Sequence, residues 1–227
     1  MNYHDISFSG AALKALGSGA LWWPDQALLC VSDLHLGKSE RVARRGGQSL
    51  PPYETRDTLT RLGEDLAFAN ARQVVCLGDS FDDLAAADAM PDDERLWITR
   101  LQAGRRWIWI EGNHDPGPVE FGGTHLQDLT LGPLTFRHIA QTGTHGEISG
   151  HYHPKASVQT RGRRVTRPAF LFDDRRMIMP AYGTYTGGLH ARDAALADLM
   201  QPGTFAVLTG PQPLRVPMPM PGREPTA

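Results

Sequence analysis

The amino-acid sequence predicts an α/β fold. Three short, almost wholly apolar runs, at residues 27–31, 73–77 and 107–110, are typical of buried strands. The segments between them are amphipathic: residues 53–69 carry leucines at helical spacing, and residues 88–104 form a second predicted helix. Beyond about residue 126, shorter apolar segments separated by turn residues predict antiparallel strands.

Length and composition favour one domain. The chain has 227 residues, of which 41% are hydrophobic, which is enough for a substantial core. Because no repeat and no clear linker divides it, we expect a single domain over residues 1–210. Residues 211–227 are rich in Pro and Met and predict a poorly ordered tail.

The charge and the cysteines narrow the function classes. The net charge of -2 provides no global attraction to nucleic acid, so binding to a polyanion would need a local basic patch. Cys30 and Cys76 lie within predicted strands and are expected to be reduced core residues. No apolar run of about 18 residues and no secretory signal is visible, so we expect a cytoplasmic protein without a membrane partner.

Asp33 and His35 follow the first predicted strand. Residues two apart in an extended chain point the same way, so both side chains could converge on one metal ion. The alternative is an Asp that caps a turn beside an incidental surface His.

The next segment, residues 37–47, is the most basic of the chain. Four cationic side chains against one acidic residue could bind the phosphates that flank a reacting one; they are Lys38, Arg41, Arg44 and Arg45. A solvated helix face with ordinary charges is the alternative.

Gly78 ends the second predicted strand and Asp79 follows it. Asp79, Asp82 and Asp83 place three carboxylates within five residues, and these repel one another unless cations neutralise them. A metal ion is one natural partner. The acidic residues at 92–94 lie near the start of the second predicted helix, where the helix dipole favours them structurally.

The third strand leads into Gly112-Asn113-His114-Asp115. The Asn113 amide oxygen could bind a metal, His114 could donate a proton, and Asp115 could orient His114. Further along, His138 follows a predicted strand or hairpin, and His151 and His153 repeat the two-residue spacing. The glycine-rich segment 181–190 lacks a phosphate-loop spacing, so we interpret it as a packed loop.

These clusters supply more ligands than one ion needs. Two ions bridged by a carboxylate, with Asp79 as the best bridge, would use all seven candidates: Asp33, His35, Asp79, Asn113, His138, His151 and His153. The set lacks cysteine, which favours manganese, iron or zinc in a catalytic centre over a structural zinc site. Such a centre lowers the pKa of a bridging water, and the resulting hydroxide could attack phosphorus while His114 protonates the leaving oxygen.

Four of these motifs, in this order, resemble the calcineurin-like metallophosphoesterase superfamily: Asp33-Leu34-His35, Gly78-Asp79, Gly112-Asn113-His114-Asp115 and Gly150-His151-Tyr152-His153. Further motifs, including 50–56 and 185–189, are similar to the bacterial ligase-associated DNA damage response endonuclease family. The resemblance covers residues 20–195 and implies a two-sheet β sandwich flanked by α helices.

The resemblance also implies roles. One metal would bind Asp33, His35, Asp79 and His153, and the other Asp79, Asn113, His138 and His151. His145 is the fallback for His138, because Ile139-Ala140 follows His138 where many relatives have Gly or Pro. The implied activity is manganese-dependent cleavage of DNA in repair, with a DNA ligase and a helicase as partners. Two alternatives remain: an esterase for small phosphate esters or nucleotides, and a non-catalytic scaffold on the same fold.

Overall fold

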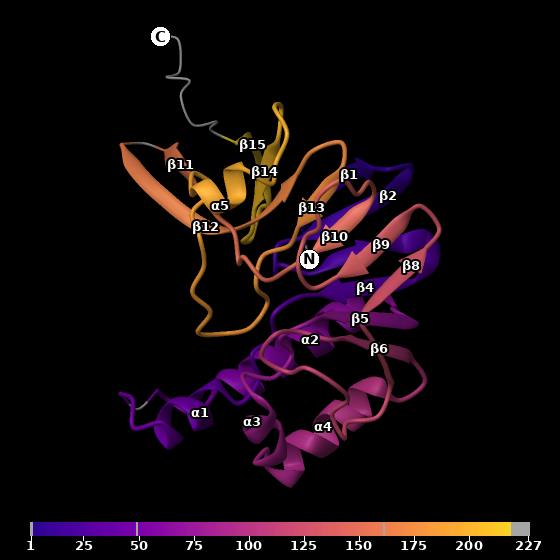
Figure 1. The fold of residues 1–227 in the computed structure, drawn as a ribbon, viewed down its shortest axis with the longest axis vertical. Helices are drawn as coiled ribbons and strands as arrows, with labels where there is room; N and C mark the ends of the chain where they lie inside the picture. Colours follow the sequence, from indigo (N-terminus) through magenta and orange to yellow (C-terminus); the bar gives the residue numbers. More distant parts are fainter. Residues whose placement is uncertain (1, 49, 161, 219–227) are drawn as a thin grey trace.

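The structure is a computed structural model that describes residues 2–48, 50–160 and 162–218. Two β sheets pack face to face, and the longer helices cover the outer face of the first sheet (Figure 1). This architecture confirms the α/β sandwich that the sequence predicted.

The first sheet has seven strands in chain order. The amino-terminal strands pair antiparallel, whereas β4 to β7 run parallel. The strands are β1 (Tyr3–Phe8), β2 (Ala11–Leu16), β3 (Leu21–Trp23), β4 (Leu28–Val31), β5 (Gln73–Leu77), β6 (Arg106–Ile110) and β7 (Thr124–Leu126). The three buried strands expected from the apolar runs are therefore confirmed as β4, β5 and β6.

The second sheet is mostly antiparallel, except that β10 runs parallel to both of its neighbours. Its order is β15 (Leu214–Pro217), β14 (Phe205–Leu208), β12 (Arg163–Phe172), β13 (Arg176–Ile178), β10 (Glu147–Ser149), β9 (Leu134–Arg137) and β8 (Asp128–Leu131). A further strand, β11 (Lys155–Thr160), pairs with the free part of β12 as a projecting hairpin (Figure 1).

The helices are α1 (Lys38–Arg44), α2 (Glu54–Ala69), α3 (Leu84–Asp88), α4 (Asp92–Gln102) and α5 (Ala194–Ala197), with a short 3₁₀ helix η1 (Pro24–Gln26). Residues 88–104 were expected to form one helix. The structure instead begins α4 at Asp92, because Pro91 stands at the N-cap and its fixed φ suits a helix start better than a helix interior.

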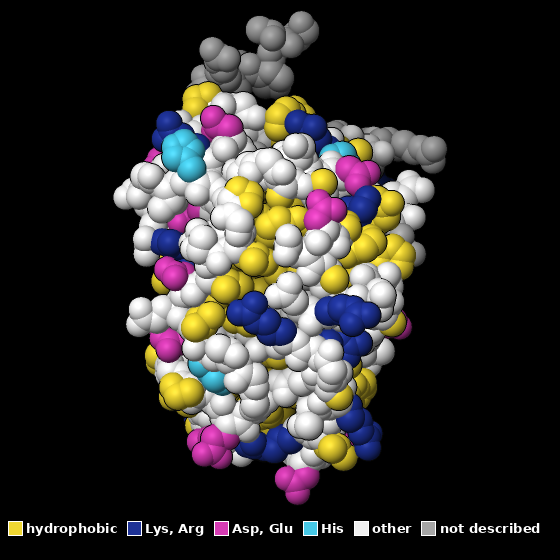
Figure 2. Space-filling model, turned by 90° about the vertical axis from the view of Figure 1, so that its right-hand side faces the viewer, with side chains coloured by type: hydrophobic (Ala, Val, Ile, Leu, Met, Phe, Trp, Pro, Cys, Tyr) yellow, Lys and Arg dark blue, Asp and Glu magenta, His cyan; other side chains and the backbone are white. Residues whose placement is uncertain are grey.

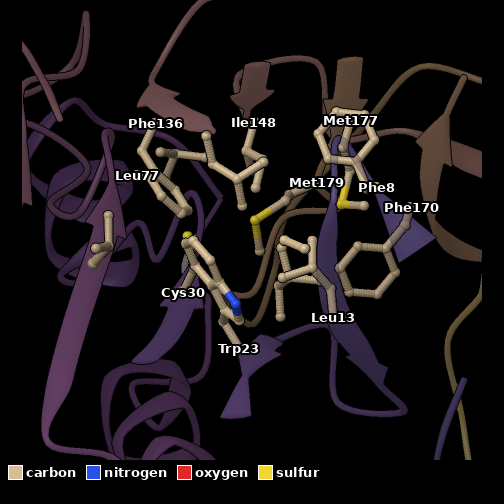
Figure 3. Packing of buried hydrophobic residues seen from close by; sticks show 14 of the residues in the cluster. Phe8, Leu13, Trp23, Cys30, Leu77, Phe136, Ile148, Phe170, Met177 and Met179 are labelled. Atoms are coloured by element: carbon tan, nitrogen blue, oxygen red, sulfur yellow. The ribbon is translucent and has the colours of Figure 1, made fainter. Parts of the chain in front are cut away.

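Two apolar layers hold these elements together. Between the sheets, side chains such as Leu13, Cys30, Leu77, Phe136 and Met177 interdigitate (Figure 3). A second layer packs the leucines of α2 and Ile98 of α4 against the outer face of the first sheet. Cys30 and Cys76 are buried free thiols, as expected.

The sequence did not predict the amino-terminal hairpin. Ile6 and Phe8 on β1 face the core together with Leu13 of β2, which is a period-two pattern over a short stretch. Ser9 and Gly10 link the strands with φ of 48° and 84°, which is the backbone of a two-residue hairpin turn.

Part of the predicted carboxy-terminal tail is a strand. β15 pairs with β14 in the register Leu208↔Leu214, which corrects the expectation of disorder for residues 214–217. Residues 219–227 lie outside the described part of the chain. Within the described ranges, no helix is long and apolar enough to cross a membrane.

Candidate active site

The candidate site is built where β4, β5 and β6 end. Parallel strands bring their carboxyl ends to the same edge of a sheet, so the loops that follow them meet there. The loops after β4 and β5 are tied together, since Asp33 N–H donates to the Gly78 carbonyl and His35 N–H to the Asp79 carbonyl, over 3.2 and 3.0 Å. From the second sheet, His138 follows β9 and His151 follows β10 closely.

The backbone of this site is unusual. Nine described residues other than glycine have positive φ, and five of them are candidate ligands: Asp33, His35, Asp79, His151 and His153. The left-handed region is strained for residues with a Cβ and persists where surrounding contacts hold it, as at functional sites. Asp33 and His35 therefore converge through left-handed turns, and the extended-strand alternation expected for them is wrong.

Two glycines permit this close packing. A Cβ on Gly112 would lie 2.1 Å from the backbone nitrogen of Asp79, and one on Gly150 would lie 1.9 Å from Ser32 Oγ. Both distances are far below any tolerated contact. Only glycine fits these positions without moving the ligand loops.

The first cluster contains Asp33, His35 and His153. His153 Nε2 lies 3.1 Å from Asp33 Oδ1 and 3.4 Å from His35 Nε2. Asp33 is fully buried and also accepts from the backbone N–H of His151 over 3.0 Å. One ligand atom from each of the three residues lies within 4.8 Å of the others.

The second cluster contains Asp79, Asn113, His138 and His151. From His138 Nε2, the distances are 3.3 Å to Asp79 Oδ2, 3.0 Å to Asn113 Oδ1 and 3.3 Å to His151 Nδ1. The exposed His145 lies outside both clusters, whereas His138 is only 4% exposed. The structure thus brings His138 to the site, and not its fallback.

The hydrogen bonds of the rings leave lone pairs directed at both clusters. His138 Nδ1 donates to the Leu77 carbonyl over 3.0 Å, so Nε2 of the neutral ring faces Asp79 and Asn113 as an acceptor. His35 Nδ1 likewise donates to Asp82 Oδ1 over 2.8 Å, which turns its Nε2 towards His153. Acceptors that converge without donors need a cation, so both donor sets fit divalent metal ions.

Within the second cluster, His138 and Asp79 shift the pKa of each other in opposite directions. Burial alone would lower the pKa of His138, but the hydrogen bond to Asp79 and the charge of Asp33 raise it to about 9. Burial would raise the pKa of Asp79, whereas its contact with His138 lowers it to about 2. A metal ion would therefore displace a proton from His138, which couples metal binding to pH.

The structure pairs Asp79 with the second cluster, and Asp33 contacts both groups of histidines. Asp33 Oδ1 lies 3.1 Å from His153 Nε2 and 3.9 Å from His138 Nδ1. The expected bridging role of Asp79 therefore stays a prediction. Asp79 Oδ1 meanwhile accepts from the backbone N–H of His114 over 2.8 Å, which ties the β6 loop to this cluster.

His114 lies beside the first cluster. Its ring centroid is 5.1 Å from that of His35, and the two rings are nearly perpendicular. Its Nδ1 donates to the backbone carbonyl of Asp82 over 2.7 Å, which leaves Nε2 available for a substrate.

Comparison with known proteins decides the family. Residues 27–181 match the family model described as calcineurin-like phosphoesterase. The chain belongs to this family. It is therefore a metal-dependent phosphoesterase, and the superfamily resemblance found in the sequence is confirmed. No protein with curated annotation matches the chain.

A solved structure is similar over nearly the whole phosphoesterase. The crystal structure of Pseudomonas putida nuclease MPE is 30% identical in sequence, with a TM-score of 0.72. The match covers 94% of this chain and 100% of the other. The likeness therefore extends across both sheets.

The structure corrects the role expected for Asp115. This buried carboxylate accepts from the backbone N–H groups of Ser80, Phe81 and Gly112, over 2.7, 3.1 and 3.1 Å. Within the described part of the chain, no hydrogen bond joins it to His114. Asp115 therefore holds the β5 and β6 loops together, and the orientation of His114 comes from Asp82.

Asp82 was not assigned a role from the sequence, although it was one of the three clustered carboxylates. It is fully buried. Burial would raise the pKa of Asp82, but the hydrogen bond from His35 and the charge of Lys38 lower it well below its usual range. Asp82 thus orients His35 through its carboxylate and His114 through its carbonyl.

The four basic residues of segment 37–47 face this same acidic loop. α1 and Arg45, which follows it, place these side chains on three carboxylates, in the pairs Lys38–Asp82 (3.4 Å), Arg41–Asp82 (2.9 Å), Arg44–Glu40 (2.9 Å), Arg44–Asp83 (2.8 Å) and Arg45–Asp83 (3.3 Å). Protein cations therefore neutralise part of the carboxylate cluster that suggested a metal. Figure 2 shows the other side of the molecule, away from α1, where Lys and Arg stand in small groups among acidic and apolar side chains.

Proposed function

We propose that this phosphoesterase is a nuclease that hydrolyses phosphodiester bonds of DNA. The observation that supports a nucleic-acid substrate is the similarity, over 94% of the chain, to a solved structure described as a nuclease. The two donor clusters and His114 supply groups for phosphoester hydrolysis in general, so the choice of DNA rests on that similarity.

We assign the metals as the resemblance implies: one to Asp33, His35, Asp79 and His153, the other to Asp79, Asn113, His138 and His151. Two divalent ions at these positions would neutralise phosphate charge and make water a nucleophile near neutral pH. Manganese is the proposed metal, and iron or zinc would suit the same mixed nitrogen and oxygen donors.

His114 supplies the proton in this proposal. The Asp82 carbonyl accepts the hydrogen on Nδ1, so the proton that can be transferred is the one on Nε2. His114 gives this proton to the departing oxygen of the scissile bond, which removes the charge that would otherwise develop there. The backbone N–H of His114 is bound to Asp79, and this contact fixes the distance between the acid and the metal ligands.

The remaining proposals concern the cellular role, the partners and the residues that bind flanking phosphates. The sequence resemblance supports a role in DNA repair, with a DNA ligase and a helicase as partners, and we propose that this role is carried out in the cytoplasm. Lys38, Arg41, Arg44 and Arg45 are proposed to bind flanking phosphates. These four cations pair with three carboxylates, Glu40, Asp82 and Asp83, which leaves capacity for an anion.

Activity profiling tests the proposed function. Manganese-loaded protein should cleave bis-(p-nitrophenyl) phosphate and DNA strands, and Asp79→Ala should abolish both activities. Absence of DNA cleavage would contradict the proposal. A strong preference for phosphomonoesters or mononucleotides would favour the small-ester alternative. Absence of all activity in well-folded, metal-loaded wild-type protein would favour the non-catalytic scaffold.

A further inference from the structure

The loop between β13 and α5 descends from the second sheet towards α1 and α2 (Figure 1). Two of its glycines lie directly against the backbone of candidate ligand residues. Gly183 N–H donates to the Asp33 carbonyl over 3.0 Å, and a Cβ on Gly188 would lie 2.0 Å from the His153 carbonyl oxygen. Residues 184–187 therefore form an arch whose two ends rest on the first cluster.

Tyr185 occupies the middle of this arch with a strained backbone. Its φ is 63°, in the left-handed region that glycine or asparagine would adopt at lower cost. A large aromatic side chain at such a position requires a compensating gain, which is why strained residues point to functional contacts.

The ring of Tyr185 meets a second tyrosine. The centroids of Tyr185 and Tyr53 are 5.4 Å apart at 61°, an edge-on contact, and Tyr53 is 52% exposed. The Tyr185 hydroxyl donates to the Pro51 carbonyl over 3.2 Å, which orients its ring. Two segments distant in sequence thus present an accessible aromatic pair, and one member of it lies on the arch whose ends contact the first cluster.

We propose that Tyr53 and Tyr185 form a stacking subsite for a nucleobase of a single-stranded nucleic acid, adjacent to the reacting phosphate. The inference rests on the proposed nuclease function. Tyr185 lies two residues from Gly183, a span of at most about 7 Å, so its ring is within reach of the nucleotide next to the metal cluster. Aromatic faces stack on any base, which gives affinity without sequence preference.

A binding experiment tests the subsite directly. The His114→Ala protein, loaded with manganese, is titrated with a fluorescent single-stranded oligonucleotide and with an abasic oligonucleotide of the same length. Tyr53→Leu and Tyr185→Leu should each weaken binding of the normal strand by roughly 5- to 100-fold. The same substitutions should change binding of the abasic strand far less, because it offers no base to stack.

Two further variants separate stacking from other roles of the ring. Tyr185→Phe removes the hydroxyl that donates to the Pro51 carbonyl but keeps the π face, so it should retain the affinity for the normal strand. Tyr3→Leu changes an exposed tyrosine on β1, 41% exposed and packed on Trp22, and should leave affinity unchanged. Equal losses for both oligonucleotides in the Leu variants would overturn the inference.

Tyr185→Gly distinguishes function from packing. Because glycine relieves the left-handed strain, the inference expects an unchanged or raised melting temperature together with the loss of affinity. A lowered melting temperature with intact affinity would show a packing role and contradict the subsite. If wild-type protein neither cleaves nor binds DNA, the proposed function fails as well. If wild-type protein does cleave DNA but the Tyr variants bind it normally, only the stacking subsite fails.

Discussion

His114 donates its Nδ1 hydrogen to the backbone carbonyl of Asp82 over 2.7 Å. A carbonyl cannot give up a proton or change its charge, so this contact fixes the ring without competing for the proton on Nε2. The orientation of the proposed acid therefore depends on the course of the β5 loop and not on the neighbouring Asp115.

The residues of Gly112-Asn113-His114-Asp115 should fail in different ways. His114→Ala is expected to keep both metal ions and lose about 10²- to 10⁴-fold in turnover, the usual contribution of a general acid. Asn113→Ala removes an oxygen 3.0 Å from His138 Nε2 and should lower the metal content. Metal analysis by mass spectrometry beside kinetics checks both, and metal loss in the His114 variant would overturn the assignment.

Asp82→Ala should impair the site although Asp82 belongs to neither proposed ligand set. It removes the acceptor that orients His35 and leaves Lys38 and Arg41 without a buried partner. Loss of such a supporting contact costs about 10- to 100-fold in metal affinity or activity. Asp82→Asn keeps an acceptor for His35, so it should lose less. Equal losses in metal titrations of the two variants would argue against this role.

The candidate ligands that the structure brings together could be picked out from the sequence, because each follows or closes an apolar run. Parallel strands end at a common edge, so Asp33, Asp79 and Asn113 had to approach one another once β4, β5 and β6 were identified. The left-handed φ at Asp33 and His35 could not be predicted, because Asp and His adopt this region more often than most residues but usually do not, so their presence does not mark it.

The supporting contacts could not be predicted for a related reason. Asp115 is adjacent to His114 in the chain, which suggested a contact between them. The actual partner of His114, Asp82, lies 32 positions away and contacts it through a backbone carbonyl, which carries no sequence signal. The β1–β2 hairpin was missed because its alternating pattern is short and includes several alanines.

Asp115→Ala should act on stability before activity. It would leave three buried backbone N–H groups without acceptors, at a cost of about 1–3 kcal/mol each. For a chain of this length, even 3 kcal/mol lowers the melting temperature by roughly 6–12 °C. Calorimetry without metals measures this directly. An unchanged melting temperature with lost turnover would instead restore the orienting role for Asp115.

Asp65 should make stability depend on pH. Burial raises the pKa of Asp65, whose carboxylate accepts from the Tyr182 hydroxyl over 2.8 Å. Because the folded-state pKa is raised, the protonated Asp65 carboxyl group stabilises the fold fully below pH 4, the pKa of the unfolded state. This stabilisation is lost as the pH rises through the folded-state pKa.

Asp65→Asn keeps an acceptor for Tyr182 but cannot ionise. Its free energy of unfolding, relative to wild type, should therefore rise with pH above 4. Urea unfolding of both proteins from pH 4 to pH 8 checks the sign. Parallel stability curves would show that Asp65 does not titrate in this range.

Arg45 separates phosphate binding from internal ion pairing in the basic segment. Its side chain is 60% exposed and lies 3.3 Å from Asp83. If it binds a phosphate, Arg45→Ala should reduce the slope of log affinity against log salt by about 0.7 for single-stranded DNA. Arg72→Ala, an exposed change at the opposite end of β5, is the matched control and should leave the slope unchanged. An equal slope in both variants and in wild type would show that Arg45 only neutralises Asp83. The basic segment would then stabilise the acidic loop at this position and not bind the substrate there.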